Sequence, residues 1–167
     1  MDAERTASPR GESSHSPRDA ALGCAVDTLR EALAPAVLLV QALPIDDTCV
    51  TLEPAQLVPA VHVLIHQCGL YHLSAITADD TGDGISLLYH FWDGHGLTLR
   101  TVLPAEQPVI ATLTDLIPGA SFYEREAAEM LGVTFEGAAP AGPLLLPDDW
   151  DGPPPLLRSA PEQEAAP

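Results

Sequence analysis

The chain has 167 residues, 46% of them hydrophobic, which suits one folded domain whose core needs no disulfide or metal. Acidic residues number 24 against seven arginines and no lysine, giving a formal net charge of −17. Such an excess of acid argues against binding nucleic acid or anionic lipid and suits a basic protein partner. A surface kept acidic for solubility is the alternative.

Both ends of the chain differ in composition from its middle. Residues 1–17 are rich in serine, proline and charge, which predicts a disordered N-terminal tail. Residues 18–137 form the predicted domain, and residues 138–167 an extended, proline-rich C-terminal anchoring tail. No signal peptide or membrane-spanning run is visible, so we expect no direct membrane span.

The first half predicts a helix, two strands and a second helix. Asp19 is typical of a cap for a helix that ends near residue 33, before Pro35. The nearly continuous apolar run at 36–43 predicts a buried strand, and alternation at 48–52 predicts its neighbour. The next helix begins at Pro54 or Pro59 and ends at Gly69.

Three strands and a last helical region follow. The strands are predicted at 71–77, 85–92 and 97–103, with a glycine-rich hairpin turn between the last two. The helical region spans about 112–131, is broken at Pro118, and ends at Gly132. The order predicts an α+β single domain whose largely antiparallel mixed sheet is flanked by helices, with an extended C-terminal tail.

Standard catalytic signatures are missing. The sequence has no GxSxG motif or cysteine signature, and the lack of lysine rules out a P-loop and Schiff-base chemistry. His62 and His66 have ligand spacing on one helix face, but Val63 stands where a metalloprotease motif needs glutamate. We therefore expect no catalytic, cofactor-binding or metal residues, with a histidine-based metalloenzyme as an alternative.

Two segments are typical of protein recognition. The first joins charged and aromatic residues on the last helix, and the second places an apolar run before acids and a tryptophan, a common interface residue. The alternatives are an ordinary exposed helix and a tail folded onto its own core. The predicted partner-binding residues are Tyr123, Glu124, Arg125, Glu126, Asp148, Asp149, Trp150 and Arg158.

These segments carry a resemblance to a known family. The Tyr-Glu-Arg-Glu run at 123–126, the Gly-Val-Thr-Phe-Glu-Gly turn at 132–137 and the Leu-Leu-Pro-Asp-Asp-Trp-Asp-Gly run at 145–152 follow one order. In that order they resemble the C subunit of the proton-pumping NADH:quinone oxidoreductase, respiratory complex I. The chain departs from the family where basic residues usually follow Gly137 and Gly152, with only Arg158 remaining.

The resemblance implies a scaffold rather than an enzyme. Such a subunit has no cofactor of its own, while FMN, iron–sulfur clusters and quinone belong to partner subunits. Its partners would be the large quinone-site, hydrogenase-like subunit and the iron–sulfur subunits. It would lie on the cytoplasmic face of the cell membrane, held there by the complex. A membrane-bound group 4 [NiFe] hydrogenase, a formate hydrogenlyase-like complex or an assembly factor are the alternatives.

Overall fold

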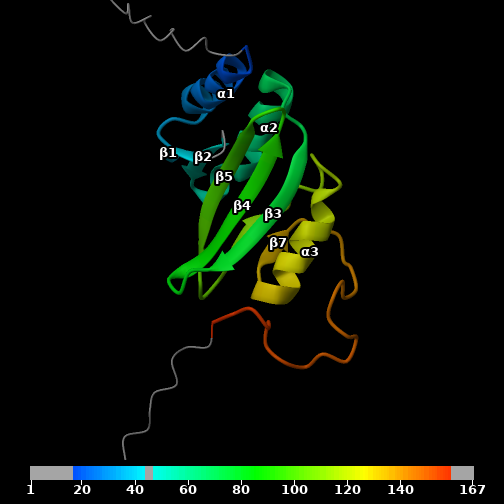
Figure 1. The fold of residues 1–167 in the computed structure, drawn as a ribbon. Coiled ribbons are helices and arrows are strands. Elements are labelled where there is room, and N and C mark those ends of the chain that lie inside the picture. Colours follow the sequence, from blue (N-terminus) through cyan, green and yellow to red (C-terminus); the bar gives the residue numbers. More distant parts are fainter. Residues whose placement is uncertain (1–16, 44–46, 159–167) are drawn as a thin grey trace, which may run out of the picture.

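The computed structural model describes residues 17–43 and 47–158 (Figure 1). The predicted disordered tail, apart from Pro17, lies outside the described residues, as do residues 44–46 and the last part of the C-terminal tail. Pro17 itself begins the first helix. None of the helices in the described part is long and apolar enough to cross a bilayer.

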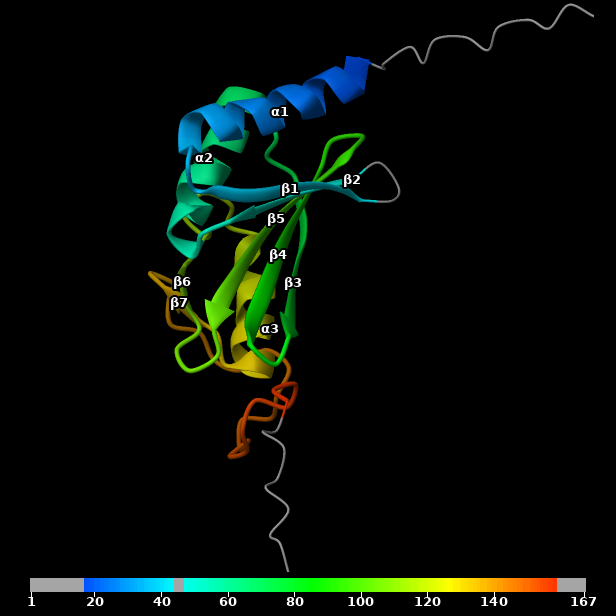
Figure 2. The ribbon, with the colours of Figure 1, turned by 90° about the vertical axis from the view of Figure 1, so that its left-hand side faces the viewer.

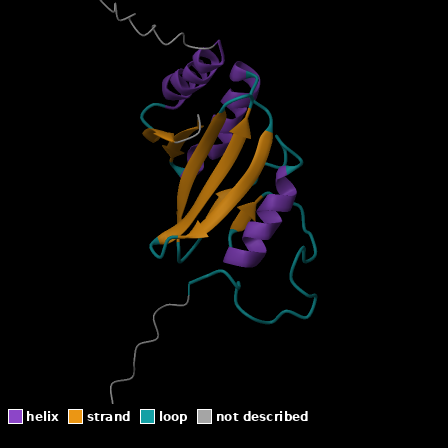
Figure 3. Ribbon diagram, viewed as in Figure 1, coloured by secondary structure: helices purple, strands orange, loops and turns teal. Residues whose placement is uncertain are grey.

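A five-stranded sheet forms the centre of the domain. Its order is β1-β2-β5-β4-β3, in which only the β2–β5 pair is parallel. This confirms the predicted α+β class with a largely antiparallel mixed sheet (Figure 3). The strands are β1 (Val37–Leu43), β2 (Asp47–Leu52), β3 (Leu73–Asp80), β4 (Gly84–Trp92) and β5 (Gly96–Pro104).

Three α-helices accompany the sheet. Helix α1 (Pro17–Leu33) packs on α2 (Leu57–Cys68), and α3 (Ala120–Leu131) packs along β3 at the other end (Figures 1 and 2). A short 3-10 turn, Pro54–Gln56, leads into α2. Helices α2 and α3 both end at a left-handed glycine, Gly69 and Gly132, as predicted, because that conformation costs an L-residue more than glycine.

The core lies between the helices and one face of the sheet. Alternate residues of β4 point into it, as the period of a strand requires. They meet buried leucines, valines and alanines from all three helices. The core residues of β4 are Ile85, Leu87, Tyr89 and Phe91.

Two sequence predictions were wrong. The strand at 36–43 was expected to be buried, but β1 is the rim of the sheet, and Leu38 and Leu39 are 59% and 47% exposed. The apolar run predicted burial, yet it could not show which strand would lie at an edge. The last helix starts at Ala120 rather than near 112, because Pro118 and Gly119 separate it from the turn before.

A second, smaller sheet was not predicted. Strands β6 (Val109–Ala111) and β7 (Thr134–Glu136) pair in parallel on either side of α3 in the chain. Each has three residues, too few for a period-2 pattern to stand out. Together they fix the two ends of the α3 region relative to each other.

Candidate partner-binding site

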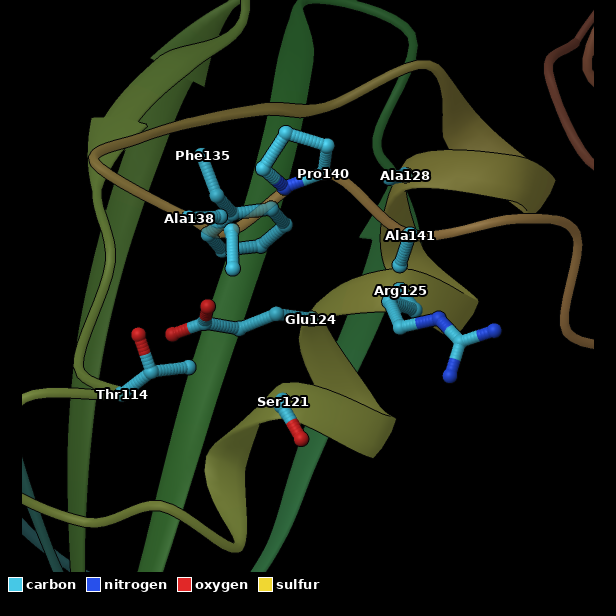
Figure 4. A pocket seen from close by; sticks show the side chains of 10 residues that line it. Thr114, Ser121, Glu124, Arg125, Ala128, Phe135, Ala138, Pro140 and Ala141 are labelled. Atoms are coloured by element: carbon cyan, nitrogen blue, oxygen red, sulfur yellow. The ribbon is translucent and has the colours of Figure 1, made fainter.

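Helix α3 places consecutive side chains of the predicted motif on different sides. In Figure 4, the Glu124 side chain points from the helix toward Thr114, whereas the Arg125 side chain leaves the helix on the opposite side. About 100° separates neighbouring side chains on a helix. One side therefore faces the domain and the other faces the C-terminal segment.

Glu124 lies inside the domain, with only 2% of its surface exposed. Its carboxylate accepts hydrogen bonds from the Leu113 N–H at 2.7 Å and from the Thr112 hydroxyl. Burial raises the pKa of Glu124, although these two hydrogen bonds oppose the rise. The side chain was predicted to bind a partner, but in the structure it connects α3 to the preceding turn.

Arg125 and Glu129 hold the chain beyond β7. One guanidinium nitrogen of Arg125 donates to the Gly142 carbonyl at 2.8 Å and the Pro143 carbonyl at 3.1 Å. One turn later, the Glu129 carboxylate accepts from three consecutive backbone N–H groups, those of Leu144, Leu145 and Leu146. A cation thus meets carbonyls and an anion meets amides, so both side chains match the polarity of the extended backbone.

The same contacts set the ionisation of Glu129. Partial burial alone would raise its pKa, but the N–H groups of residues 144–146 and the charge of Arg125 lower the pKa below its usual range. The carboxylate is therefore the stable form when the segment is in place. The attachment of residues 144–146 to α3 therefore depends on the negative charge of Glu129.

A second set of contacts holds the far end of the segment. The Leu156 N–H donates to the Met130 carbonyl at 2.9 Å, and the Arg158 N–H donates to the Asp80 carboxylate at 2.8 Å. The Arg158 N–H is the first cause of a lowered pKa at Asp80, followed by the Gly82 N–H. Residues 138–158 thus form a loop attached at both ends, here named the C-terminal loop (Figures 1 and 2).

Large apolar side chains are exposed on this loop and beside it. Leu145, Trp150 and Leu156 are 59%, 48% and 60% exposed, and Phe122 on α3 is 61% exposed. Three of them belong to the C-terminal loop and the fourth to the helix that holds this loop. We call these four residues the apolar set.

Two cavities flank Arg125. One, of about 420 Å³, has walls formed by Ala128, Phe135 and Pro140, with Glu124 at its inner end (Figure 4). The other, of about 380 Å³, lies between Arg125 and Trp150. Within the described residues, the Arg125 Nε is buried with no hydrogen-bond partner. The Thr114 hydroxyl at the first cavity is hydrogen-bonded to the Thr112 hydroxyl at 2.9 Å.

The remaining predicted residues occupy varied positions. The Tyr123 hydroxyl donates to the Ser74 carbonyl of β3 at 2.8 Å. Glu126, on the same helix as Tyr123, is exposed. The side chains of four loop residues are exposed as well: Asp148, Asp149, Trp150 and Arg158. The predicted partner-binding residues did not include Glu129 or Asp80, because a sequence does not signal which backbone amides a carboxylate will meet.

The described histidines belong to no group of three potential metal ligands. The rings of His62 and His66 lie 4.2 Å apart, centroid to centroid, but no group of three potential ligands occurs in the described ranges. His90 uses both ring nitrogens in hydrogen bonds with Thr77 and Thr98, at 2.9 and 3.0 Å.

The fold and this surface define a small α+β domain with a loop anchored beside α3. A solved structure titled Nqo5, a trypsin-resistant fragment (1–134), shares the fold with a TM-score of 0.60 at 22% identity, covering 72% of this chain and 99% of that one. The family model described as respiratory-chain NADH dehydrogenase, 30 Kd subunit, matches residues 50–165. The chain belongs to this family, and the match extends beyond the motifs that suggested it.

Two curated relatives are named as subunits of different kinds of complex. The C subunit of the NADH-quinone oxidoreductase of Roseiflexus castenholzii is 31% identical over 93 residues, covering 56% of this chain and 52% of that protein. The membrane-bound hydrogenase subunit beta of Pyrococcus furiosus is 37% identical over 85 residues, covering 47% and 49%. The chain thus spans about half the length of these relatives.

Proposed function

We propose that the chain is a non-catalytic, cofactor-free scaffold subunit in the peripheral arm of a proton-pumping NADH:quinone oxidoreductase. It braces the large quinone-site subunit, while FMN, iron–sulfur clusters and quinone are bound by partner subunits. The complex holds it at the cytoplasmic face of the membrane. The observation that carries the proposal is the C-terminal loop, fastened to α3 by Arg125 and Glu129.

The contacts of α3 suggest how the motif serves such a role. Glu124, Arg125 and Glu129 are engaged with their own chain, and the last two hold the part of the loop that carries Leu145 and Trp150 in place for a partner. A preformed loop loses less conformational entropy on binding than a free tail. Asp148 and Asp149, both exposed beside Trp150, would pair with basic groups around the partner's contact.

The cavities supply a second kind of contact. An apolar side chain of the partner fits between Ala128, Phe135 and Pro140. A carbonyl or carboxylate oxygen entering beside it would satisfy the Arg125 Nε, whose burial without a partner is costly. Arg125 would then serve both the loop and the partner.

A second candidate role is the equivalent subunit of a membrane-bound group 4 [NiFe] hydrogenase or formate hydrogenlyase-like complex. The specific support is the similarity to a membrane-bound hydrogenase subunit, whose identity of 37% is comparable to the 31% found for the quinone oxidoreductase relative. The two roles share a fold and differ in the neighbouring subunits.

Mass spectrometry of proteins that co-purify with a tagged copy, from gently solubilised native membranes, separates the two roles. A flavin-containing, NADH-oxidising partner together with quinone-oxidoreductase subunits is the expected result. A nickel-ligating large subunit without that partner would support the hydrogenase role. Recovery of the chain alone would contradict both.

A further inference from the structure

The two edges of the central sheet differ in how they are protected. At the β3 edge, α3 packs alongside, Tyr123 donates to the Ser74 carbonyl, and Asp80 accepts from the end of the C-terminal loop. At the β1 edge, no described segment pairs with the outer side of the strand. Open edges expose backbone N–H and C=O groups that can pair with another strand.

The composition of β1 makes this edge unusual. Its seven residues, Val-Leu-Leu-Val-Gln-Ala-Leu, include no charge and no proline, the features that normally block edge pairing. Leu38, Leu39 and Leu43 are 59%, 47% and 40% exposed. A bulge disturbs the register only between Val37 and Leu39, so residues 39–43 remain regular. The strand is therefore suited to accept a neighbour.

Three occupants are possible, and the chain's own ends are the first. Residues 1–16 contain one large apolar residue, Met1, together with a proline, and residues 159–167 contain no large apolar residue and two prolines. Sequences of this kind form strands poorly, because proline lacks the N–H that pairing needs. The termini of the chain are thus poor partners for β1.

A second copy of the chain is disfavoured by charge. Each copy has a formal net charge of −17. An exposed acid lies near one end of the edge, since Val37 pairs with Leu52, which directly precedes Glu53, whereas the Asp47 carboxylate accepts from Thr98 of β5, on the other side of β2. Pairing of two β1 strands would bring two strongly acidic domains together, and like charges repel.

We propose that β1 is a docking edge for an extended segment of another subunit, which adds to the sheet as a sixth strand. The segment would have apolar residues at alternate positions, to cover Leu39 and Leu43, and lysine or arginine near the end that lies beside Val37, to face Glu53. Main-chain hydrogen bonds provide the pairing, and side chains select the partner. The inference goes beyond the proposed function, because it involves neither α3 nor the C-terminal loop.

Photo-cross-linking in the native assembly tests the proposal. The full chain would carry p-benzoylphenylalanine in place of Leu38, and the cross-linked peptides would be sequenced. The expected product joins β1 to one segment of another subunit with the apolar and basic pattern described. A link to a second copy, a link to residues 1–16 or 159–167, or a yield no higher than that without the photoreactive residue would overturn it.

Paired substitutions give the second readout. Leu39→Lys on the same background should lower the cross-link yield by roughly tenfold or more, because it places an unpaired charge at an apolar contact. Val102→Lys is the matched control, since Val102 is 41% exposed on β5, an interior strand, and should leave the yield unchanged. Thermal unfolding of both variants checks that the fold is intact. Equal yields for the two variants would overturn the proposal.

Discussion

The Glu129 carboxylate accepts a 2.8 Å hydrogen bond from the Leu145 N–H, joining α3 to a residue 16 positions further along the chain. Arg125, one helical turn earlier, holds the two residues that precede this run. The motif that was predicted to bind a partner thus first organises its own chain. Under the proposed function, contacts with another protein depend on that organisation.

Glu129→Gln should loosen the C-terminal loop without unfolding the domain. It removes the charge that three backbone N–H groups share, and we expect the free energy of unfolding to fall by about 1 kcal/mol, since the site is partly open to solvent. Amide hydrogen exchange at 144–146 should become faster. Glu126→Gln is the matched control, because Glu126 is exposed to solvent on the same helix. Equal effects of the two substitutions would contradict the role of Glu129.

The loop contact should also depend on pH. Because the pKa of Glu129 is lowered in the folded protein, its stabilising effect is present above the ordinary carboxyl pKa. The effect is lost as the pH falls through the lowered value. Exchange at 144–146, measured on lowering the pH and corrected for intrinsic rates, should therefore approach that of Glu129→Gln. A constant difference between the two proteins would count against this linkage.

Glu124 should show the opposite sign. Its pKa is raised by burial, so the folded protein holds this proton more tightly than the unfolded chain does. The free energy of unfolding contributed by this group therefore falls as the pH rises from about 4.3, the ordinary carboxyl pKa, through the raised value. Glu124→Gln should remove this slope in denaturant titrations at several pH values. An unchanged slope would exclude Glu124 as its source.

Glu124→Ala should be more damaging than Glu124→Gln at any pH. It leaves the Leu113 N–H and the Thr112 hydroxyl without their buried acceptor. We expect the free energy of unfolding to fall by about 2–4 kcal/mol, from the lost hydrogen bonds and the space left behind. Thermal unfolding of both variants gives the comparison, and similar melting temperatures would show that the carboxylate is not a structural link.

Substitutions at the two helix-ending glycines test how the far end of the C-terminal loop packs on α3, because only Gly132 lies next to the loop. Gly132 and Gly69 have φ of 72° and 69°, so alanine at either should cost about 1 kcal/mol or somewhat more. At Gly132 the added Cβ would also lie 3.3 Å from the Pro154 Cγ, whereas at Gly69 it meets nothing within 4 Å. Gly132→Ala should therefore speed exchange near Leu156 as well, and Gly69→Ala should not.

Arg125→Ala should weaken incorporation into the complex while leaving the domain folded. It removes the contacts with Gly142 and Pro143 and the unpaired buried Nε, all of them outside the central core. Arg125→Lys restores a charge but not the planar fork, and should rescue incorporation only in part. The measurement is the fraction of tagged chain in the assembled complex. Full incorporation of Arg125→Ala would contradict a role for this residue in assembly.

The sequence predicted most of the scaffold because its signals are local. Gly69 and Gly132 ended their helices as expected, and the glycine turn at 93–96 joined β4 to β5. The exposure of β1 could not be predicted, because an apolar run gives the same signal at an edge and at the centre of a sheet. The site was predicted as a region rather than as a set of contacts.

The contacts of Glu124 and Glu129 could not be predicted from local sequence patterns. Both are acidic residues on one helix, yet one is buried against the preceding turn and the other meets residues 144–146. The difference depends on how distant segments fold back onto α3, and side-chain type does not encode it. Arg125 and Glu129 are four residues apart, so helical spacing puts them on one face, but spacing does not show what that face will hold.

Hydrogen exchange over residues 138–158, compared between the isolated chain and the native complex, tests the central claim most directly. If α3 presents the C-terminal loop to a partner subunit, amides around Leu145, Trp150 and Leu156 should exchange more slowly in the complex. Amides in the β4 core should change little, because they are already protected. Equal exchange of the loop in the two states would contradict the claim that this loop binds the partner.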